Sequence, residues 1–111
     1  MNIYDKAHEL AKALSESDEY KEFKKAKEEI KKDEKAKEML KDLREKELEV
    51  QALALSGKPY SEEEKKLRNL YEIISYHSGI RKYIEAENRL MVLISDIQKI
   101  IFKAIDTSLE D

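Results

Sequence analysis

The first glycine of the chain is Gly57, and no proline precedes it. Glycine and proline are the residues that most strongly disfavour helix interiors, while Ala, Glu, Lys, Leu and Arg, which favour helices, dominate the preceding segment. A strong break comes only at Ser56-Gly57-Lys58-Pro59, because Gly57 suits a left-handed helix terminus and Pro59 prevents continuation. No segment alternates polar and apolar residues over the length of a strand. The sequence therefore predicts an all-α protein.

Apolar residues at helical spacing and capping residues divide the first half of the chain into helices. One apolar stripe begins at Ile3 and ends at Leu14. Ser17 follows as a plausible cap for a second helix, because its hydroxyl can accept a hydrogen bond from a free amide of the next turn. Asp33 offers another cap, so residues 17–56 form either one helix or two.

Two more helices are expected after the turn. Ser61 and Glu64 have the spacing of a capping box, in which the serine serves a free amide while the glutamate reaches back. The last helix runs from about residue 80 to residue 105. Together these segments predict an antiparallel bundle of about four to five helices with a long C-terminal helix, forming a single domain of residues 1–111.

The C-terminal helix carries more apolar surface than one neighbouring helix covers, because Leu93, Ile100 and Ala104 widen its stripe. Each additional buried Leu or Ile is worth about 1.5–3 kcal/mol, so several of them can drive association. We therefore predict a homodimer with this helix at its interface. The candidate interface residues are Tyr83, Leu90, Met91, Ile94, Ile97 and Ile101. The alternative is that the short first helix folds back over this surface within one subunit.

Residue types that carry chemistry are few. The absence of cysteine excludes disulfides, thiolate zinc sites, iron–sulfur clusters and a cysteine nucleophile. The only glycines, Gly57 and Gly79, are too far apart to build a phosphate-binding loop. His8 and His77 have no neighbours at ligand spacing, which favours structural roles for both. We predict no catalytic residues, no metal site and no cofactor.

Three polar residues, Glu47, Gln51 and Glu87, fall on otherwise apolar stripes. They could line a polar pocket within the bundle. The favoured interpretation is that each lies at the edge of its stripe, where the stem of the side chain packs while the head reaches water.

The charge balance does not favour nucleic acid as a partner. With 22 basic and 25 acidic residues, the chain has a net charge of −3, and its lysines are not segregated along the sequence. The alternative function is an RNA-binding accessory protein that uses the lysine-rich surface of the second and third helices. The candidate residues for that function are Lys24, Lys27, Lys31 and Lys35.

A membrane location is not expected. The most apolar stretch, residues 90–105, is shorter than the ~20 residues of a membrane-spanning helix, and charged residues interrupt it. The first residues lack the basic and apolar regions of a signal peptide. The sequence therefore predicts a cytoplasmic protein.

Several segments together are typical of a known family. They are residues 3–11 (IYDKAHELA), 17–23 (SDEYKEF), 49–51 (EVQ) and 83–90 (YIEAENRL). On these residues the chain resembles the YlbF/YmcA family of small all-helical bacterial proteins, and the likeness covers nearly the whole chain.

The resemblance implies an antiparallel helical fold that is dimeric or higher and has no catalytic residues. Relatives act as regulatory partner proteins in competence, sporulation and biofilm formation, and are linked to an RNA-processing endoribonuclease. Some carry cysteines tied to an iron–sulfur cluster, a property that this cysteine-free chain cannot share. We therefore expect a non-enzymatic regulatory protein that self-associates through its C-terminal helix and docks to a protein partner.

Overall fold

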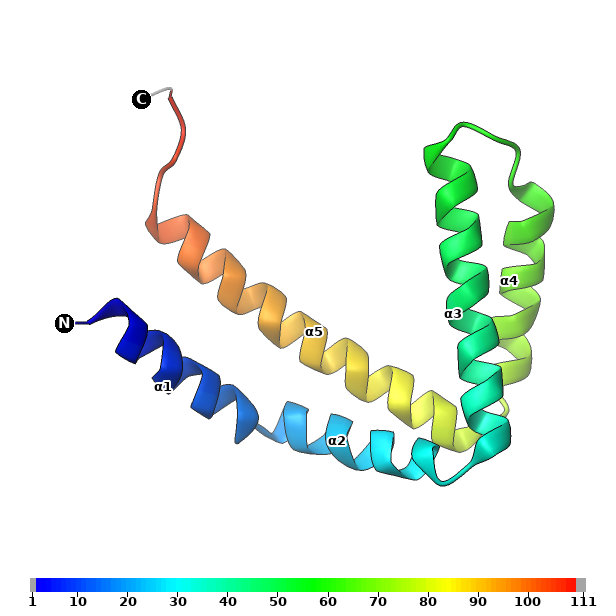
Figure 1. Ribbon diagram of the computed structural model, residues 1–111, viewed down its shortest axis with the longest axis horizontal. Helices are drawn as coiled ribbons and strands as arrows, with labels where there is room; N and C mark the ends of the chain where they lie inside the picture. The colour runs from blue at the N-terminus through cyan, green and yellow to red at the C-terminus, as the bar shows by residue number, and fades with distance from the viewer. Residues whose placement is uncertain (1, 110–111) are drawn as a thin grey trace.

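The chain folds into five α-helices, as a computed structural model that describes residues 2–109 shows (Figure 1). Their bounds are α1 (Ile3–Ser15), α2 (Asp18–Lys31), α3 (Glu34–Leu55), α4 (Ser61–Ile74) and α5 (Ser78–Ala104). No strand occurs in this part of the chain. The predicted all-α class with a long C-terminal helix is therefore confirmed.

The capping residues explain where the first helices begin. The Ser17 hydroxyl accepts a hydrogen bond from the Tyr20 amide at 3.1 Å, and the Asp33 carboxylate accepts one from the Ala36 amide at 3.0 Å. The Ser17 cap was predicted, whereas the Asp33 cap was one of two alternatives, and its presence settles that residues 17–56 contain two helices. Gly57 has a φ of +71°, the left-handed conformation expected at the end of α3.

Two predicted boundaries differ from the structure. The capping box at Ser61 is not formed, because the Glu64 amide donates to the Tyr60 carbonyl and Ser61 is thereby the first residue inside the helix. The last helix begins at Ser78, two residues earlier than expected. Its cap is His77, whose Nδ1 accepts a hydrogen bond from the Ile80 amide at 3.1 Å.

The helices form two arms that diverge from a common elbow (Figure 1). In the first arm, α2 packs along the N-terminal half of α5, and α1 continues beside the C-terminal half. In the second arm, α3 and α4 form an antiparallel hairpin. The molecule is flat and open, with extents of 51 × 39 × 16 Å.

The hydrophobic core lies at the elbow and draws on four helices. Its buried members are Ile30 of α2, Ala36 and Leu43 of α3, Ile74 of α4 and Ile80 of α5. Four of these five residues lie within one turn of a helix end. The core therefore holds the helices together where the two arms meet, and not along the length of each arm. Ala86 and Leu90 extend the buried surface a short way along α5.

A polar contact ties the two turns of the elbow together. His77, between α4 and α5, places its Nε2 3.3 Å from Oδ2 of Asp33, between α2 and α3. Because Nδ1 of the same ring accepts from the Ile80 amide, the proton lies on Nε2 and is donated to Asp33. The pKa of Asp33 is lowered mainly by the hydrogen bond from the Ala36 amide and further by His77.

This arrangement predicts an acid-sensitive contribution to stability. A lowered pKa in the folded protein means that Asp33 stabilises the fold above the ordinary aspartate pKa of about 3.9, and that this stabilisation disappears as the pH falls through the folded-state value. Asp33→Asn keeps a capping side chain but cannot ionise. We expect the variant to lose less stability than the wild type between pH 6 and pH 3, measured by urea unfolding at each pH. Equal losses in the two proteins would contradict the assignment.

Candidate self-association surface

The C-terminal half of α5 exposes much of its apolar surface. Ile100 and Phe102 are 69% and 67% exposed, and Met91, Val92, Ile101 and Ile105 are each about half exposed. Leu93, Ile94 and Ile97 are partly buried. The surface that the sequence identified is thus only partly shielded within one chain.

The six predicted interface residues fall into three groups. Met91 and Ile101 are exposed and available to a partner. Ile94 and Ile97 are partly buried, and Tyr83 packs against the elbow core beside Phe23, with 5.3 Å between the ring centroids. Leu90 is buried within the chain. Their shared role in an interface stays a prediction.

Helix α1 does not cover the surplus surface, although it lies beside the same half of α5 (Figure 1). None of its residues is buried. Ile3 is almost fully exposed and Leu10 is just over one-third exposed, although both belong to its apolar stripe. Two apolar surfaces, one on α1 and one on the end of α5, are therefore open to solvent together.

The accessible surface area of the chain is larger than that of a compact protein of the same mass. A compact protein of 13.1 kDa is expected to have an accessible surface of about 6,400 Å² and a radius of gyration of about 13 Å. The observed values are 9,122 Å² and 18.5 Å. An excess of about 2,700 Å² on each of two copies would amount to roughly 5,400 Å² in total, the upper end of the total area that obligate complexes bury.

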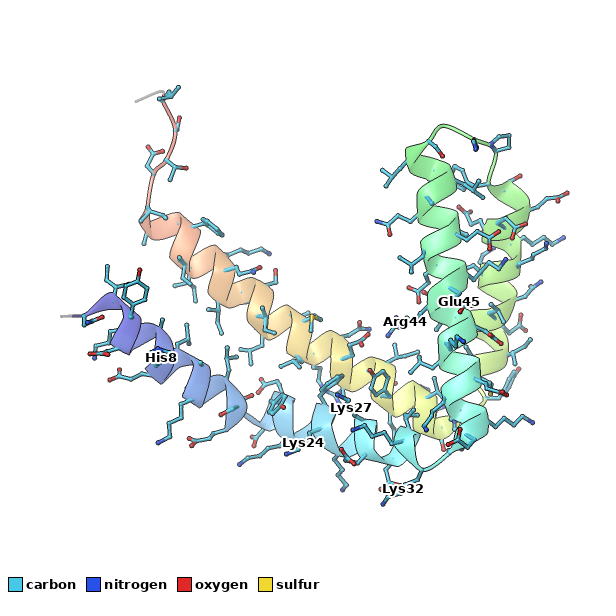
Figure 2. All side chains as sticks on the ribbon, in the orientation of Figure 1. His8, Lys24, Lys27, Lys32, Arg44 and Glu45 are labelled. Atoms are coloured by element: carbon cyan, nitrogen blue, oxygen red, sulfur yellow. The ribbon has the colours of Figure 1, made fainter. Side chains whose placement is uncertain are left out.

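A polar cluster bridges the two arms just above the elbow core. Arg44 of α3 donates to Glu47 of the same helix at 3.1 Å and to Glu87 of α5 at 2.5 Å. Figure 2 shows its side chain pointing from α3 into the angle between the arms. All three side chains are between one-quarter and two-fifths exposed, so the ion pairs are partly shielded from water.

Two tyrosines complete the cluster. Burial is the main cause that raises the pKa of Tyr71 and of Tyr83, and the neighbouring carboxylates, Glu47 and Glu87 respectively, raise it further. The sequence singled out both glutamates but missed Arg44, whose only local signal was its position three residues before Glu47. Gln51, the third polar residue singled out, is exposed and outside the cluster. The Arg44–Glu87 contact of this cluster joins α3 of one arm to α5 of the other.

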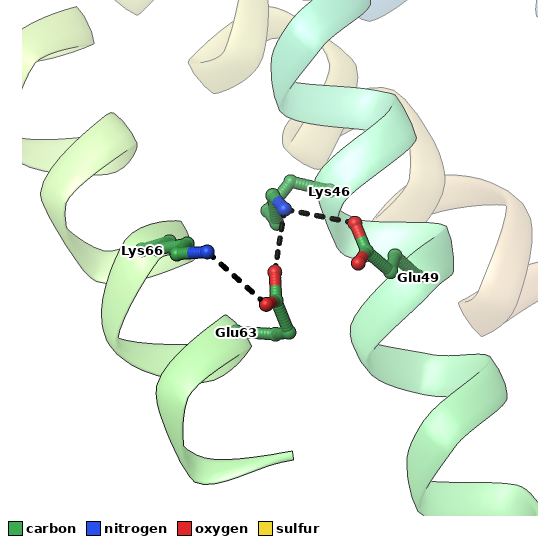
Figure 3. A network of polar contacts seen from close by, with 4 residues as sticks. All are labelled: Lys46, Glu49, Glu63 and Lys66. Atoms are coloured by element: carbon green, nitrogen blue, oxygen red, sulfur yellow. Dashed lines mark hydrogen bonds and ion pairs between the residues drawn. The ribbon is translucent and has the colours of Figure 1, made fainter.

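The hairpin arm has its own charge network, which Figure 3 shows. Lys46 of α3 donates to Glu49 at 2.8 Å and across to Glu63 of α4 at 2.6 Å, and Lys66 donates to Glu63 at 3.2 Å. Hydrogen bonds from Lys46 and Lys66 lower the pKa of Glu63. The network joins α3 to α4 through Lys46 and Glu63, whose side chains are each only 21% exposed.

The lysines of the RNA-binding alternative lie mostly on α2. Lys24, Lys27 and Lys31 follow helical spacing there, and Lys35 begins α3. Figure 2 shows Lys24 on the side of α2 away from α5. Lys31 is paired with Glu28 at 3.5 Å. RNA binding through these residues stays a prediction.

Neither histidine lies in a ligand cluster. Within residues 2–109, no group of three or more His, Cys, Asp or Glu side chains is arranged to hold a metal ion. His8 lies exposed on α1, and His77 serves as the cap of α5. None of the helices that the structure describes is long and apolar enough to cross a membrane.

Comparison with known proteins identifies the family. Residues 3–106 match the family described as control of competence regulator ComK, YlbF/YmcA. The chain belongs to the YlbF/YmcA family. The match includes all five helices, so the whole fold described above is that of a YlbF/YmcA protein.

Relatives from several bacteria share the YlbF/YmcA sequence over nearly their full length. A UPF0342 protein of Caldicellulosiruptor saccharolyticus is 46% identical, over 95% of this chain and 88% of its own. A UPF0342 protein of Symbiobacterium thermophilum is 44% identical over 96% of both chains. A third, from Halothermothrix orenii, is 38% identical over 100% of this chain and 95% of its own.

Proposed function

We propose that this YlbF/YmcA protein is a non-enzymatic regulatory protein of the cytoplasm that self-associates through α5 and docks to a protein partner. The observation that carries the proposal is the exposed apolar surface on the C-terminal half of α5, in a chain whose accessible surface exceeds that of a compact monomer. The family description, control of the competence regulator ComK, supports a regulatory role in bacterial development. A link to RNA processing remains part of the proposal.

The physical support for the proposal is that the buried core is small while large apolar side chains at the end of α5 remain exposed. The core is confined to the elbow, and the ends of both arms contribute nothing to it. Burial of each of three side chains, Ile100, Ile101 and Phe102, would contribute about 1.5–3 kcal/mol to the free energy of association. A partner that covers this surface therefore gains a large part of its binding energy from a few side chains.

The first test is the mass of the purified full-length chain. Light scattering at micromolar concentration is expected to give about 26 kDa, twice the 13.1 kDa of one chain. A mass of about 13 kDa throughout the micromolar range would overturn self-association. The second test is capture of partners from native cytoplasm on the immobilised protein, with an α5 surface variant as control. Failure to capture any protein would overturn the docking part of the proposal.

A further inference from the structure

The contact between Arg44 and Glu87 shows which sides of α3 and α5 face each other. On a helix, residues three, four and seven apart share a side. The side of α3 that begins at Arg44 therefore continues through Leu48, Gln51 and Leu55. The side of α5 that begins at Glu87 continues through Met91, Ile94, Gln98 and Ile101, and Ile105 follows directly after the last helical residue.

These two rows of residues form the walls of the open angle between the arms, which we name the wedge. Leu48 and Leu55 on the α3 wall are 66% and 82% exposed, and Met91 and Ile101 on the α5 wall are about half exposed. Figure 1 shows the two helices separating steadily from the elbow. The wedge therefore has apolar walls on both arms and the Arg44 cluster at its base.

The C-terminal end of α5 is apolar on several sides, as is typical of a helix that is enclosed by more than one neighbour. Leu93 and Ile97 share the side of α5 that packs toward α2 and α1, since they follow Ala86 and Leu90 at helical spacing. Phe102 follows the wedge side of α5 by helical spacing, and both Phe102 and Ile105, the residue just after the helix, are more than half exposed. A helix that is apolar over so wide an arc is stable only when more than one neighbour covers it.

We propose that the wedge of one copy holds the end of α5 from a second copy, antiparallel to its own α5, and that the arrangement is reciprocal. This rests on the self-association proposed above and specifies how the two copies fit. Each α5 end would then be enclosed by its own α1, by the α5 of the other copy and by the α3 of the other copy. Both apolar walls of each wedge would be covered at once.

Length, charge and area support a second copy as the occupant. Residues 91–104 of α5 span about 21 Å and residues 44–55 of α3 about 18 Å, so the two segments are similar in length. The α3 segment carries three acidic and two basic residues, whereas the α5 segment carries one acidic and two basic residues. The opposite net charges favour this pairing. The surface excess of about 2,700 Å² fits two covered walls better than one small patch.

Substitution on the α3 wall tests the proposal without touching α5. Leu48→Glu places a charge at a position that is exposed in one copy, so the fold is expected to be retained, with unchanged far-ultraviolet circular dichroism. The dissociation constant of the dimer is expected to rise at least roughly 100-fold, because the lost contact occurs twice in a reciprocal dimer. The matched control is Ile73→Glu, an apolar site that is also more than half exposed and lies on the side of α4 opposite Tyr71. An unchanged dissociation constant for Leu48→Glu would overturn the proposal.

Cross-linking identifies the neighbours directly, and the absence of native cysteine makes single-cysteine variants specific. Leu48→Cys and Ile105→Cys proteins are mixed and treated with a short bismaleimide. A heterodimeric product in high yield is expected, whereas Ile73→Cys mixed with Ile105→Cys should give little. A dimer that cross-links Met91→Cys to Ile105→Cys but not Leu48→Cys to Ile105→Cys would overturn the wedge while leaving self-association intact. A monomeric wild type would overturn both.

Discussion

Ile101→Glu is expected to convert the self-associated protein into monomers that remain folded. Ile101 is 48% exposed in one copy, so the new carboxylate can stay in water when the chain is alone. In the associated state this carboxylate would be buried without a charge partner. It would also replace an isoleucine whose burial contributes about 1.5–3 kcal/mol to association. Because a two-fold interface contains the residue twice, the dissociation constant should rise by roughly 10²–10⁴-fold, measured by analytical ultracentrifugation over a concentration series.

The choice of Ile101 separates loss of association from loss of folding. Ile94 is partly buried against its own chain, so a charge there can unfold the protein as well as break the interface. Helicity by circular dichroism and the urea midpoint of monomeric Ile101→Glu provide the control, with Ile73→Glu on α4 as the matched surface substitution. A dimer of unchanged strength would place the interface elsewhere on the molecule.

Leu43→Ala is expected to destabilise the fold by about 2–5 kcal/mol, the range for a leucine truncated in a close-packed core. Leu43 has no solvent exposure and lies where α3 contacts the other helices of the elbow. For a chain of this size the melting temperature should fall by roughly 10–20 °C. Urea and thermal unfolding measure the loss, and both arms should unfold together because they share this core.

Lys41→Ala on the same helix is the control for Leu43→Ala. Its side chain is solvent-facing and takes part in one weak ion pair with Glu45, so a change within about 0.5 kcal/mol is expected. A loss from Leu43→Ala no larger than that of Lys41→Ala would mean that the elbow core does not hold the arms together.

Local chemistry made the helix boundaries predictable, whereas contacts between distant residues did not follow from sequence. Ser17, Asp33 and Gly57 act on the few residues next to them, and Ser17 and Gly57 were assigned correctly, while Asp33 was one of two alternatives. The predicted capping box at Ser61 is not formed, because the helix begins one residue earlier than the motif implies. The first helical hydrogen bond runs from the Glu64 amide to the Tyr60 carbonyl, so Tyr60 is the cap. The motif alone carries no information on which register is used.

The candidate surface was predicted in part for the same reason. The width of the apolar face on α5 is a property of one helix, so its exposure could be anticipated from spacing. The burial of Leu90 depends on where α2 lies, and the contact of Arg44 with Glu87 joins residues 43 positions apart. Such pairings are decided by the fold as a whole, so a single sequence does not specify them.

The lack of any buried residue in α1 has a consequence for how this protein becomes ordered. A helix of 13 residues with no buried side chain is held mainly by its own backbone hydrogen bonds and caps, which are marginal in water at this length. Under the proposed self-association, its order would depend on how many other copies are present to cover its stripe. The concentration of the protein, rather than sequence alone, would then set how much of the N-terminal segment is helical.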